Sequence, residues 1–202
     1  MSAIPVYHLT LEEYLELDRN SEERYEYFNG EVFTLSGVSQ QHDRIESNIN
    51  FQFRSKLRGK DCRSFLANMR IRTPSLTTYC YADSSALCGQ PTFEKIGGVD
   101  TLTNPQLIIE VLSESTGNYD KSQKFRHYKS IESFSEYLLV EQHIPFVLHY
   151  IKHNERFWLQ TEYDQLADII NLTSLDCELT LAEIYEDVEL ADPNTLLVAP
   201  IV

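Results

Sequence analysis

Three residues that suit metal-assisted hydrolysis lie in separate segments of the chain. Asp83 stands between Ala82 and Ser84, Glu110 lies inside an apolar run, and Lys124 follows shortly after it. Two carboxylates can hold Mg²⁺, which takes oxygen ligands and usually one or two protein carboxylates. A nearby lysine can orient a water molecule or stabilise charge on a phosphate. This set therefore predicts hydrolysis of a phosphodiester bond.

The surroundings of Glu110 are unusual for an acidic side chain. The run Leu107–Leu112 follows Pro105 and ends before a polar turn, which is typical of a buried strand. A glutamate buried in such a run is costly unless it is paired, metal-bound or protonated. The alternative is that Glu110 points to solvent from a half-exposed strand, and the rarity of buried glutamate favours a functional role.

The motifs around these residues resemble those of a known family. They are Tyr-x-Asp at 81–83, then Pro-x-Leu-Ile-Ile-Glu-Val-Leu-Ser-x-Ser-Thr at 105–116, then Tyr-Asp-x-x-x-Lys-Phe-x-x-Tyr at 119–128. The chain is similar in these motifs to the Uma-type endonucleases of the PD-(D/E)xK, restriction-endonuclease-like superfamily. Further matching segments extend the resemblance over roughly residues 7 to 165.

The resemblance implies a fold and a domain organisation. We expect an α/β (α+β) protein with a restriction-endonuclease-like core, in which helices flank a central mixed β-sheet and an extra hairpin lies near the N-terminus. We expect one domain over residues 1–202, with a core of about 7–165 and an acidic C-terminal extension.

The resemblance also implies an activity and a set of site residues. It implies a metal-dependent endonuclease acting on DNA, with Mg²⁺ or Mn²⁺ held by Asp83, Glu110 and the carbonyl group of Val111. Lys124 matches the lysine of the family, and Glu26 matches an acid that often completes such sites. A homodimer is expected, because cleavage of both strands with one site per chain is usually done by two copies.

The sequence departs from the superfamily pattern around the lysine and around the first acid. The superfamily lysine normally lies two residues after the acid, and Leu112 occupies that position here. The resemblance implies that Lys124, on the following helix, supplies the lysine instead. Lys121 is a second candidate, three residues away on the same predicted helix face, and is better explained as a surface residue. Ala82 replaces the usual proline, a change in the backbone that removes no ligand.

The distribution of charge bears on the expected DNA substrate. The formal net charge is −14, which opposes the approach of nucleic acid. A basic stretch nevertheless lies at 53–72, and its positive side chains are candidates for DNA contact: Arg54, Lys56, Arg58, Lys60, Arg63, Arg70 and Arg72. An ordinary solvated surface is an equally good explanation of this stretch.

Further composition features bear on location and redox state. No segment approaches the ~18 consecutive apolar residues of a membrane span, and the N-terminus does not match a secretory signal. We therefore expect a cytoplasmic protein without membrane contact. The four cysteines lack C-x-x-C spacing, so reduced and mostly buried thiols are expected.

Periodicity and turn residues predict the elements that position the site. Asn29-Gly30 predicts a hairpin between 24–28 and 31–36, and the segment 90–104 is expected to be a mobile insertion that could gate the site. Helices are expected at 11–17, 42–57, 119–130 and just after Thr180. Strands are expected at 62–66, 69–73, 84–87, 106–112, 135–140, 146–151 and 157–162.

Two alternatives to a DNA endonuclease stay open. The chain could be a catalytically inactive nuclease fold that serves as a binding or interaction module, which Ala82 and the acidity favour. It could also be a metal-dependent hydrolase of RNA or nucleotides.

Overall fold

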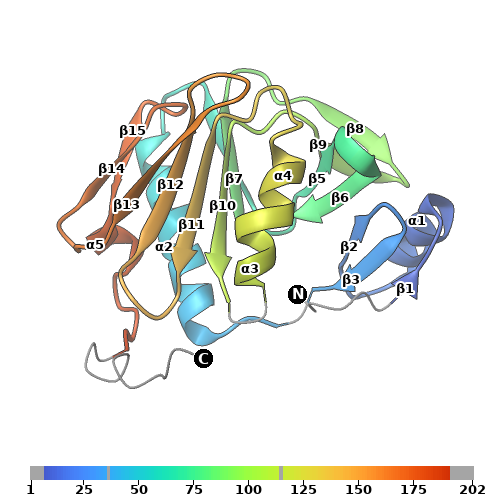
Figure 1. Cartoon of the computed structure of the whole chain (residues 1–202), viewed down its shortest axis with the longest axis horizontal. Helices are drawn as coiled ribbons and strands as arrows, with labels where there is room; N and C mark the ends of the chain where they lie inside the picture. Colours follow the sequence, from blue (N-terminus) through green and yellow to red (C-terminus); the bar gives the residue numbers. More distant parts are fainter. Residues whose placement is uncertain (1–6, 36, 114–115, 192–202) are drawn as a thin grey trace.

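The computed structural model describes residues 7–35, 37–113 and 116–191. Six strands form a mixed sheet in the order β13-β12-β11-β10-β7-β4, in which β10 pairs parallel with β11 and the other neighbours are antiparallel (Figure 1). The strands of this sheet are β4 (Cys62–Leu66), β7 (Ser84–Cys88), β10 (Leu107–Leu112), β11 (Glu136–Glu141), β12 (Val147–Lys152) and β13 (Trp158–Tyr163).

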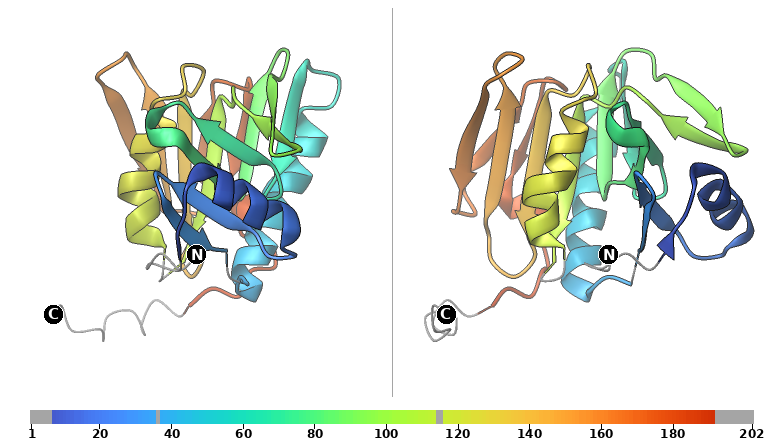
Figure 2. Two further views of the ribbon diagram at one scale, coloured as in Figure 1. Left: turned by 90° about the vertical axis from the view of Figure 1, so that its right-hand side faces the viewer. Right: turned by 45° about the vertical axis from the view of Figure 1, so that its right-hand side comes forward.

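A second sheet of seven strands has the order β1-β3-β2-β6-β5-β9-β8. Its strands are β1 (Tyr7–His8), β2 (Tyr25–Phe28), β3 (Glu31–Thr34), β5 (Arg70–Thr73), β6 (Thr78–Tyr81), β8 (Phe93–Ile96) and β9 (Val99–Leu102). The helix α1 (Leu11–Asn20) packs on this sheet through Tyr14, away from the six-stranded sheet (Figure 2).

Helices cover both faces of the six-stranded sheet. One face carries α2 (Gln40–Lys56), and the other carries a continuous helix made of α3 (Gly117–Tyr119), the π-helical turn η2 (Asp120–Lys124) and α4 (Phe125–Tyr128) (Figure 1). The remaining elements are the 3₁₀ turn η1 (Ser75–Thr77), the strand pair β14 (Ile169–Leu172) and β15 (Cys177–Thr180), and α5 (Leu181–Ile184).

The alternation of side chains along β10 explains how one strand serves two packing layers. Ile109 and Val111 pack with the buried residues of α2, whereas Ile108 and Leu112 pack with those of α4. Because successive side chains of a strand point to opposite faces, Glu110 lies on the same face as Ile108 and Leu112. Its carboxylate is thereby directed towards the helix that carries Lys124.

Most of the predicted elements are confirmed, because their local signals are strong. Asn29 and Gly30 both have positive φ (48° and 104°), as a tight hairpin turn requires. The apolar residues at four-residue intervals in and just after α2 are buried, namely Ile45, Ile49, Phe53 and Leu57. The Thr10 and Thr180 side chains cap α1 and α5. Residues of β14, β15 and α5, beyond residue 165, also pack into the core shared with α2.

The segment 90–104 does not form the expected mobile insertion. Most of it forms the hairpin β8–β9, whose turn uses Gly97 and Gly98 at positive φ, and β9 pairs with β5. None of its residues lines the pocket described below. In this structure the segment 90–104 therefore does not line the site.

The expectation of reduced thiols is wrong for two of the four cysteines. Cys62 and Cys88 lie directly opposite each other on the antiparallel strands β4 and β7 and form a disulfide. Cys80 is a buried free thiol, as expected, and Cys177 is a half-buried one. The pairing depends on strand register, which the spacing of the cysteines does not reveal.

Candidate active site

A pocket of about 390 Å³ lies where the start of α2, the end of β10 and the helix α3–η2 meet. Its acidic, basic and histidine lining residues are Arg24, His42, Asp43, Glu46, Asp83, Glu110, Asp120 and Lys124. Three of the four residues predicted to do chemistry, Asp83, Glu110 and Lys124, therefore line one cavity. The fourth, Glu26, is fully buried beside it.

Glu110 is held by two partners from the helix that covers β10. Its Oε1 atom accepts a hydrogen bond of 2.8 Å from the Tyr128 hydroxyl and lies 2.9 Å from Lys124 Nζ. Only 3% of the residue is exposed. Burial raises the pKa of Glu110 well above its usual value, although the positive charge of Lys124 opposes the shift. The expectation that Glu110 is buried in its strand is confirmed, and the structure shows it paired with Lys124.

Lys124 lies at the end of the π-helical turn and is enclosed by negative charge. Its Nζ atom lies 3.3 Å from Glu26 Oε1 and 3.7 Å from Asp120 Oδ1, and it donates a hydrogen bond of 3.1 Å to the Tyr81 carbonyl group. Burial lowers the pKa of Lys124, but the surrounding carboxylates, Glu110 first, raise it well above its usual value. The ammonium group therefore stays charged at neutral pH.

Lys121 lies outside this cluster, as favoured from the sequence. It is exposed and forms an ion pair of 3.0 Å with Glu141. The two lysines do not share one face, because a π-helical turn holds more residues than an α-helical one and rotates residues three apart further from each other.

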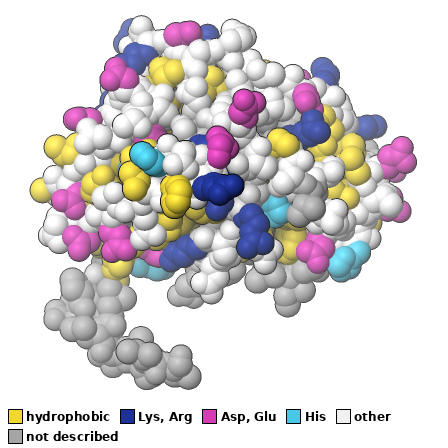
Figure 3. All heavy atoms as spheres, turned by 45° about the horizontal axis from the view of Figure 1, so that its top comes forward, with side chains coloured by type: hydrophobic (Ala, Val, Ile, Leu, Met, Phe, Trp, Pro, Cys, Tyr) yellow, Lys and Arg dark blue, Asp and Glu magenta, His cyan; other side chains and the backbone are white. Residues whose placement is uncertain are grey.

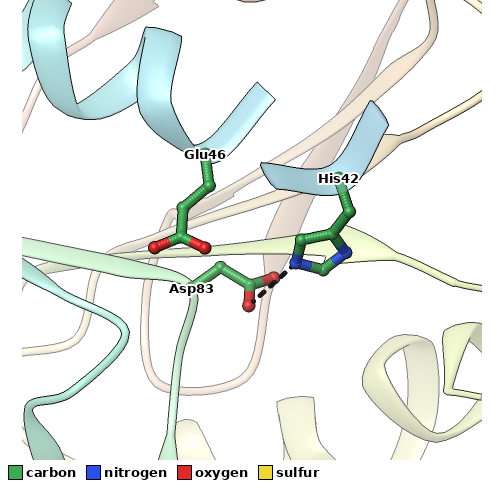
Figure 4. Close-up of side chains that lie close together, drawn as sticks. All are labelled: His42, Glu46 and Asp83. Carbon is green, nitrogen blue, oxygen red and sulfur yellow. Dashed lines mark ion pairs between the residues drawn. The ribbon is translucent and has the colours of Figure 1, made fainter. Parts of the chain in front are cut away.

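Asp83 follows β6 and lies between β10 and α2. Its Oδ2 atom accepts a hydrogen bond of 2.6 Å from the Val111 backbone N–H, and its Oδ1 atom lies 3.2 Å from His42 Nε2. Figure 4 shows His42 and Glu46 on α2, with both side chains directed towards Asp83. The preceding Ala82 is buried in the core. Asp83 is thus anchored to the strand that carries Glu110.

Comparisons with known proteins show the family of the chain. Residues 11–182 match the family model Uma2, described as "Putative restriction endonuclease". The chain belongs to the Uma2 family. Two relatives from Synechocystis sp. (strain PCC 6803) are the uncharacterised proteins sll1609 and slr1290. The first is 34% identical over 154 residues (76% of this chain, 86% of the relative). The second is 32% identical over 181 residues (90% and 93%).

A solved structure supports the fold of this Uma2 chain. The crystal structure of "a putative nuclease belonging to DUF820" from Anabaena variabilis ATCC 29413 has a TM-score of 0.71 with it, at 18% identity. The match covers 88% of this chain and 97% of the other. The expected mixed α/β fold of the restriction-endonuclease-like kind is confirmed.

Two acids of the Uma2 pocket were not predicted from the sequence as site residues. Asp120 is 3% exposed and precedes Lys124 by four positions, and Glu46 follows His42 by four. Both pairs share a helix face, so the spacing on the predicted helices was the available signal. Asp120 adds a third carboxylate around Lys124, and Glu46 adds a third ligand-type side chain beside Asp83.

The shifted pKa values in the pocket arise because several acidic side chains lie close together and are largely buried. Burial raises the pKa of Glu26 and of Asp120, and burial and Asp83 raise the pKa of Glu46 to about 7. Burial lowers the pKa of His42, but contact with Asp83 and the charge of Glu46 reverse the shift to a net rise. Such a crowded acidic site favours an added cation.

The donor set suits a divalent ion. Restriction-endonuclease-like enzymes generally use divalent metals, and the pocket offers carboxylate oxygens of the kind that Mg²⁺ and Mn²⁺ prefer. Asp120 Oδ1 is buried there without a hydrogen-bond partner, which leaves it an acceptor that a cation could satisfy. Among the described residues, the group of three that comes within 4.8 Å is His42, Glu46 and Asp83, and it does not include Glu110.

The basic stretch is a weaker candidate for DNA contact than its sequence indicated. Arg70 is 1% exposed and forms an ion pair of 2.6 Å with Asp18, so its expected contact with DNA is wrong. The reason is that Arg70 lies inside the seven-stranded sheet, where its guanidinium group also bonds Thr101. Four others are paired with acids: Lys56 with Glu183, Lys60 with Asp176, Arg63 with Asp61, and Arg72 with Glu94.

Arg54 and Arg58 on and just after α2 are exposed. Figure 3 shows acidic and basic side chains interspersed over one face of the molecule, with a small basic group near the middle of the view. Among the described residues, no helix is long and apolar enough to cross a membrane.

Proposed function

We propose that this Uma2 chain is a metal-dependent endonuclease that hydrolyses phosphodiester bonds of DNA. One arrangement carries the proposal: Asp83, Glu110 and Lys124 line the same pocket, with the Lys124 ammonium 2.9 Å from the Glu110 carboxylate. The membership of the family and the fold of the Anabaena nuclease support it.

Asp83, Glu110 and the Val111 carbonyl group would hold Mg²⁺ or Mn²⁺. When bound there, the ion would polarise the scissile phosphate and lower the pKa of a bound water molecule. The Val111 N–H orients the Asp83 carboxylate for this role by donating a hydrogen bond to one of its oxygens. The Tyr128 hydroxyl orients the Glu110 carboxylate by donating to Oε1.

Lys124 acts as a positive charge and hydrogen-bond donor rather than as a base. Its raised pKa keeps it protonated at neutral pH, and a protonated amine cannot accept a proton. It would therefore orient the attacking water or stabilise the charge that builds up on the phosphate oxygens.

Glu26 and Asp120 position Lys124. Glu26 is fully buried, does not line the pocket, and accepts a hydrogen bond of 2.8 Å from the Tyr81 N–H as well as facing Lys124. Together with Glu110, the two carboxylates hold the ammonium group at a fixed point. Glu26 is thus a positioning residue of the proposed site.

A homodimer would suit cleavage of a duplex, because one pocket per chain can attack one strand and most oligomers are symmetric pairs. The proposed location of the protein is the cytoplasm.

Nicking of supercoiled plasmid in Mg²⁺ or Mn²⁺ tests the proposal, with Lys121→Met as a matched control for Lys124→Met. Loss of one transition-state donor costs roughly 10²–10³ in rate. We expect that loss for Lys124→Met and nearly normal activity for Lys121→Met, with no nicking in EDTA. Equal activity of the two variants would refute the assigned role of Lys124.

A binding module is the second candidate. It is favoured by Ala82 and by the contacts that Lys124 and Tyr128 already make with Glu110 Oε1. A folded wild type that binds DNA in a salt-dependent manner but cleaves neither plasmid nor RNA with either ion would establish it.

A further inference from the structure

A second group of metal-ligand side chains lies on the wall of the pocket that α2 forms. His42 and Glu46 are one helical turn apart on α2, and Asp83 faces them from the end of β6 (Figure 4). One ligand atom from each of these residues lies within 4.8 Å of the other two. None of the predictions from the sequence treats His42 or Glu46 as a ligand.

We propose that His42, Glu46 and Asp83 bind a divalent transition-metal ion, with affinity falling in the order Zn²⁺, Mn²⁺, Mg²⁺. The imidazole ligand sets this preference, because nitrogen suits zinc and its neighbours whereas Mg²⁺ prefers oxygen alone. Zn²⁺ stands above Mn²⁺ in the usual order of affinity for nitrogen and oxygen ligands.

The imidazole of His42 is prepared for a ligand. Its side chain is 8% exposed, and its buried Nε2 atom makes no hydrogen bond but lies 3.2 Å from Asp83 Oδ1 as an ion-pair contact. A buried ring nitrogen without a hydrogen bond is costly in a native fold. A metal ion beside Asp83 would satisfy it.

The backbone around the group is fixed. Ser39 caps α2 by accepting a hydrogen bond of 3.1 Å from the His42 N–H, which sets the start of the helix and hence the direction of His42. The Val111 N–H holds Asp83 Oδ2, so that Oδ1 is the atom that faces α2.

The spacing needs only a small adjustment. Two ligands at about 2.0–2.2 Å from one ion lie at most about 4.4 Å apart. Atoms within 4.8 Å of each other reach that limit through rotation of the half-buried Glu46 side chain. All three residues line the pocket, so further coordination positions would face the cavity, as in a site open to substrate.

The group shares Asp83 with the pair proposed for catalysis but does not include Glu110. Glu110 is held by Lys124 and Tyr128 on the far side of β10 from α2, whereas His42 and Glu46 belong to α2 itself. Asp83 lies between the two sets of partners. One variant can therefore affect one ion and spare the other.

Calorimetric titration with Zn²⁺, Mn²⁺ and Mg²⁺ chlorides tests the assignment on the full chain, with no nucleic acid present. We expect His42→Gln to weaken Zn²⁺ and Mn²⁺ binding at least tenfold and to leave Mg²⁺ affinity within about twofold, since each 1.4 kcal/mol is tenfold. His127→Gln is the matched control, because this histidine is also buried but does not line the pocket. It should change none of the three affinities.

Glu46→Gln provides a second variant whose folding does not depend on a buried histidine, and it should weaken Zn²⁺ binding in the same way. Unchanged Zn²⁺ affinity in a folded sample of either variant, or an equal loss for Mg²⁺ and Zn²⁺, would overturn the proposal.

An activity measurement links this ion to the proposed nuclease, and that part alone rests on the proposed function. We expect His42→Gln to reduce nicking in Mn²⁺ at least tenfold more than in Mg²⁺. A chain that binds Zn²⁺ through His42 but cleaves no DNA would support the metal site and refute the proposed nuclease. A chain that nicks DNA but whose Zn²⁺ affinity does not depend on His42 would support the nuclease and refute the metal site.

Discussion

Lys124 Nζ lies 2.9 Å from Glu110 Oε1, although Lys124 is not on the strand that carries Glu110. Leu112, which occupies the superfamily position for the lysine, is buried against α4 instead. The ammonium group reaches the acid from the π-helical turn η2 on the neighbouring helix. The helix that follows β10 therefore places a lysine beside Glu110.

The pair of Lys124 and Glu110 should show strong energetic coupling. Loss of Lys124 leaves buried carboxylates without their cation, which costs about 3–5 kcal/mol, whereas after loss of Glu110 the Lys124 ammonium keeps Glu26 and Asp120 as partners. We expect Lys124→Met to destabilise the fold by about that amount and Glu110→Gln by less, and the double variant to lose at least about 1 kcal/mol less than the sum. Urea unfolding measures all three, and additive losses would contradict the pairing.

Arg70 should behave as a core residue rather than as a DNA contact. Its ion pair with Asp18 is buried on both sides, so Arg70→Met should cost about 3–5 kcal/mol of unfolding free energy. The exposed Arg54 is the control, and Arg54→Gln should stay within about 0.5 kcal/mol of the wild type. A similar stability of both variants in urea would show that Arg70 is not held in the core.

The disulfide predicts the outcome of a thiol titration. Denatured chain prepared without reductant should show two reactive thiols, those of Cys80 and Cys177, and reduced chain should show four. Reduction should lower the free energy of unfolding by about 2–4 kcal/mol. Four reactive thiols in chain purified under air would mean that Cys62 and Cys88 are not joined.

Glu136 should make stability depend on acid pH. Burial raises the pKa of Glu136. Hydrogen bonds from donors that include His149 and Ser174 lower this pKa by more, so that the net pKa lies below its ordinary value. A carboxylate with a lowered folded pKa stabilises the fold above its unfolded pKa of about 4.3, and this contribution disappears as the pH falls through the folded pKa.

Glu136→Gln tests this dependence by urea unfolding at several pH values. We expect a loss of about 3 kcal/mol at pH 7, because a neutral amide cannot accept from all the donors, and a smaller loss below about pH 4. The exposed Glu155 is the control, and Glu155→Gln should change little at any pH. A loss that is equal at pH 7 and pH 3 would contradict the charge of Glu136.

Local signals in the sequence were sufficient for most of the fold. Asn29-Gly30 marked the hairpin, the repeat from Ile45 to Leu57 marked α2, and the apolar run around Glu110 marked β10. Each of these depends on residues close together in the chain. The hairpin β8–β9 was missed because its strands have only four residues each, and Phe93, Glu94 and Lys95 are exposed.

Asp83, Glu110 and Lys124 were predictable from the sequence as members of one site, but Asp120, Glu46 and the pairings were not. Which oxygen of Glu110 meets Lys124, and which side of Asp83 meets His42, depends on how β10 packs between two helices. Arg70 shows the same limit: a basic residue in a basic stretch lies in the core because Asp18 from α1 reaches it. Contacts between distant segments decide these cases, and spacing alone does not encode them.

Calorimetric titration of Mn²⁺ into the wild type and Asp83→Ala, with plasmid nicking measured on the same samples, tests the proposed metal-dependent nuclease most directly. We predict that the wild type binds Mn²⁺ and nicks the plasmid, and that Asp83→Ala, still folded by circular dichroism, does neither. A folded wild type that neither binds Mn²⁺ nor nicks DNA, or nicking that survives in Asp83→Ala, would contradict a metal-dependent nuclease site at Asp83.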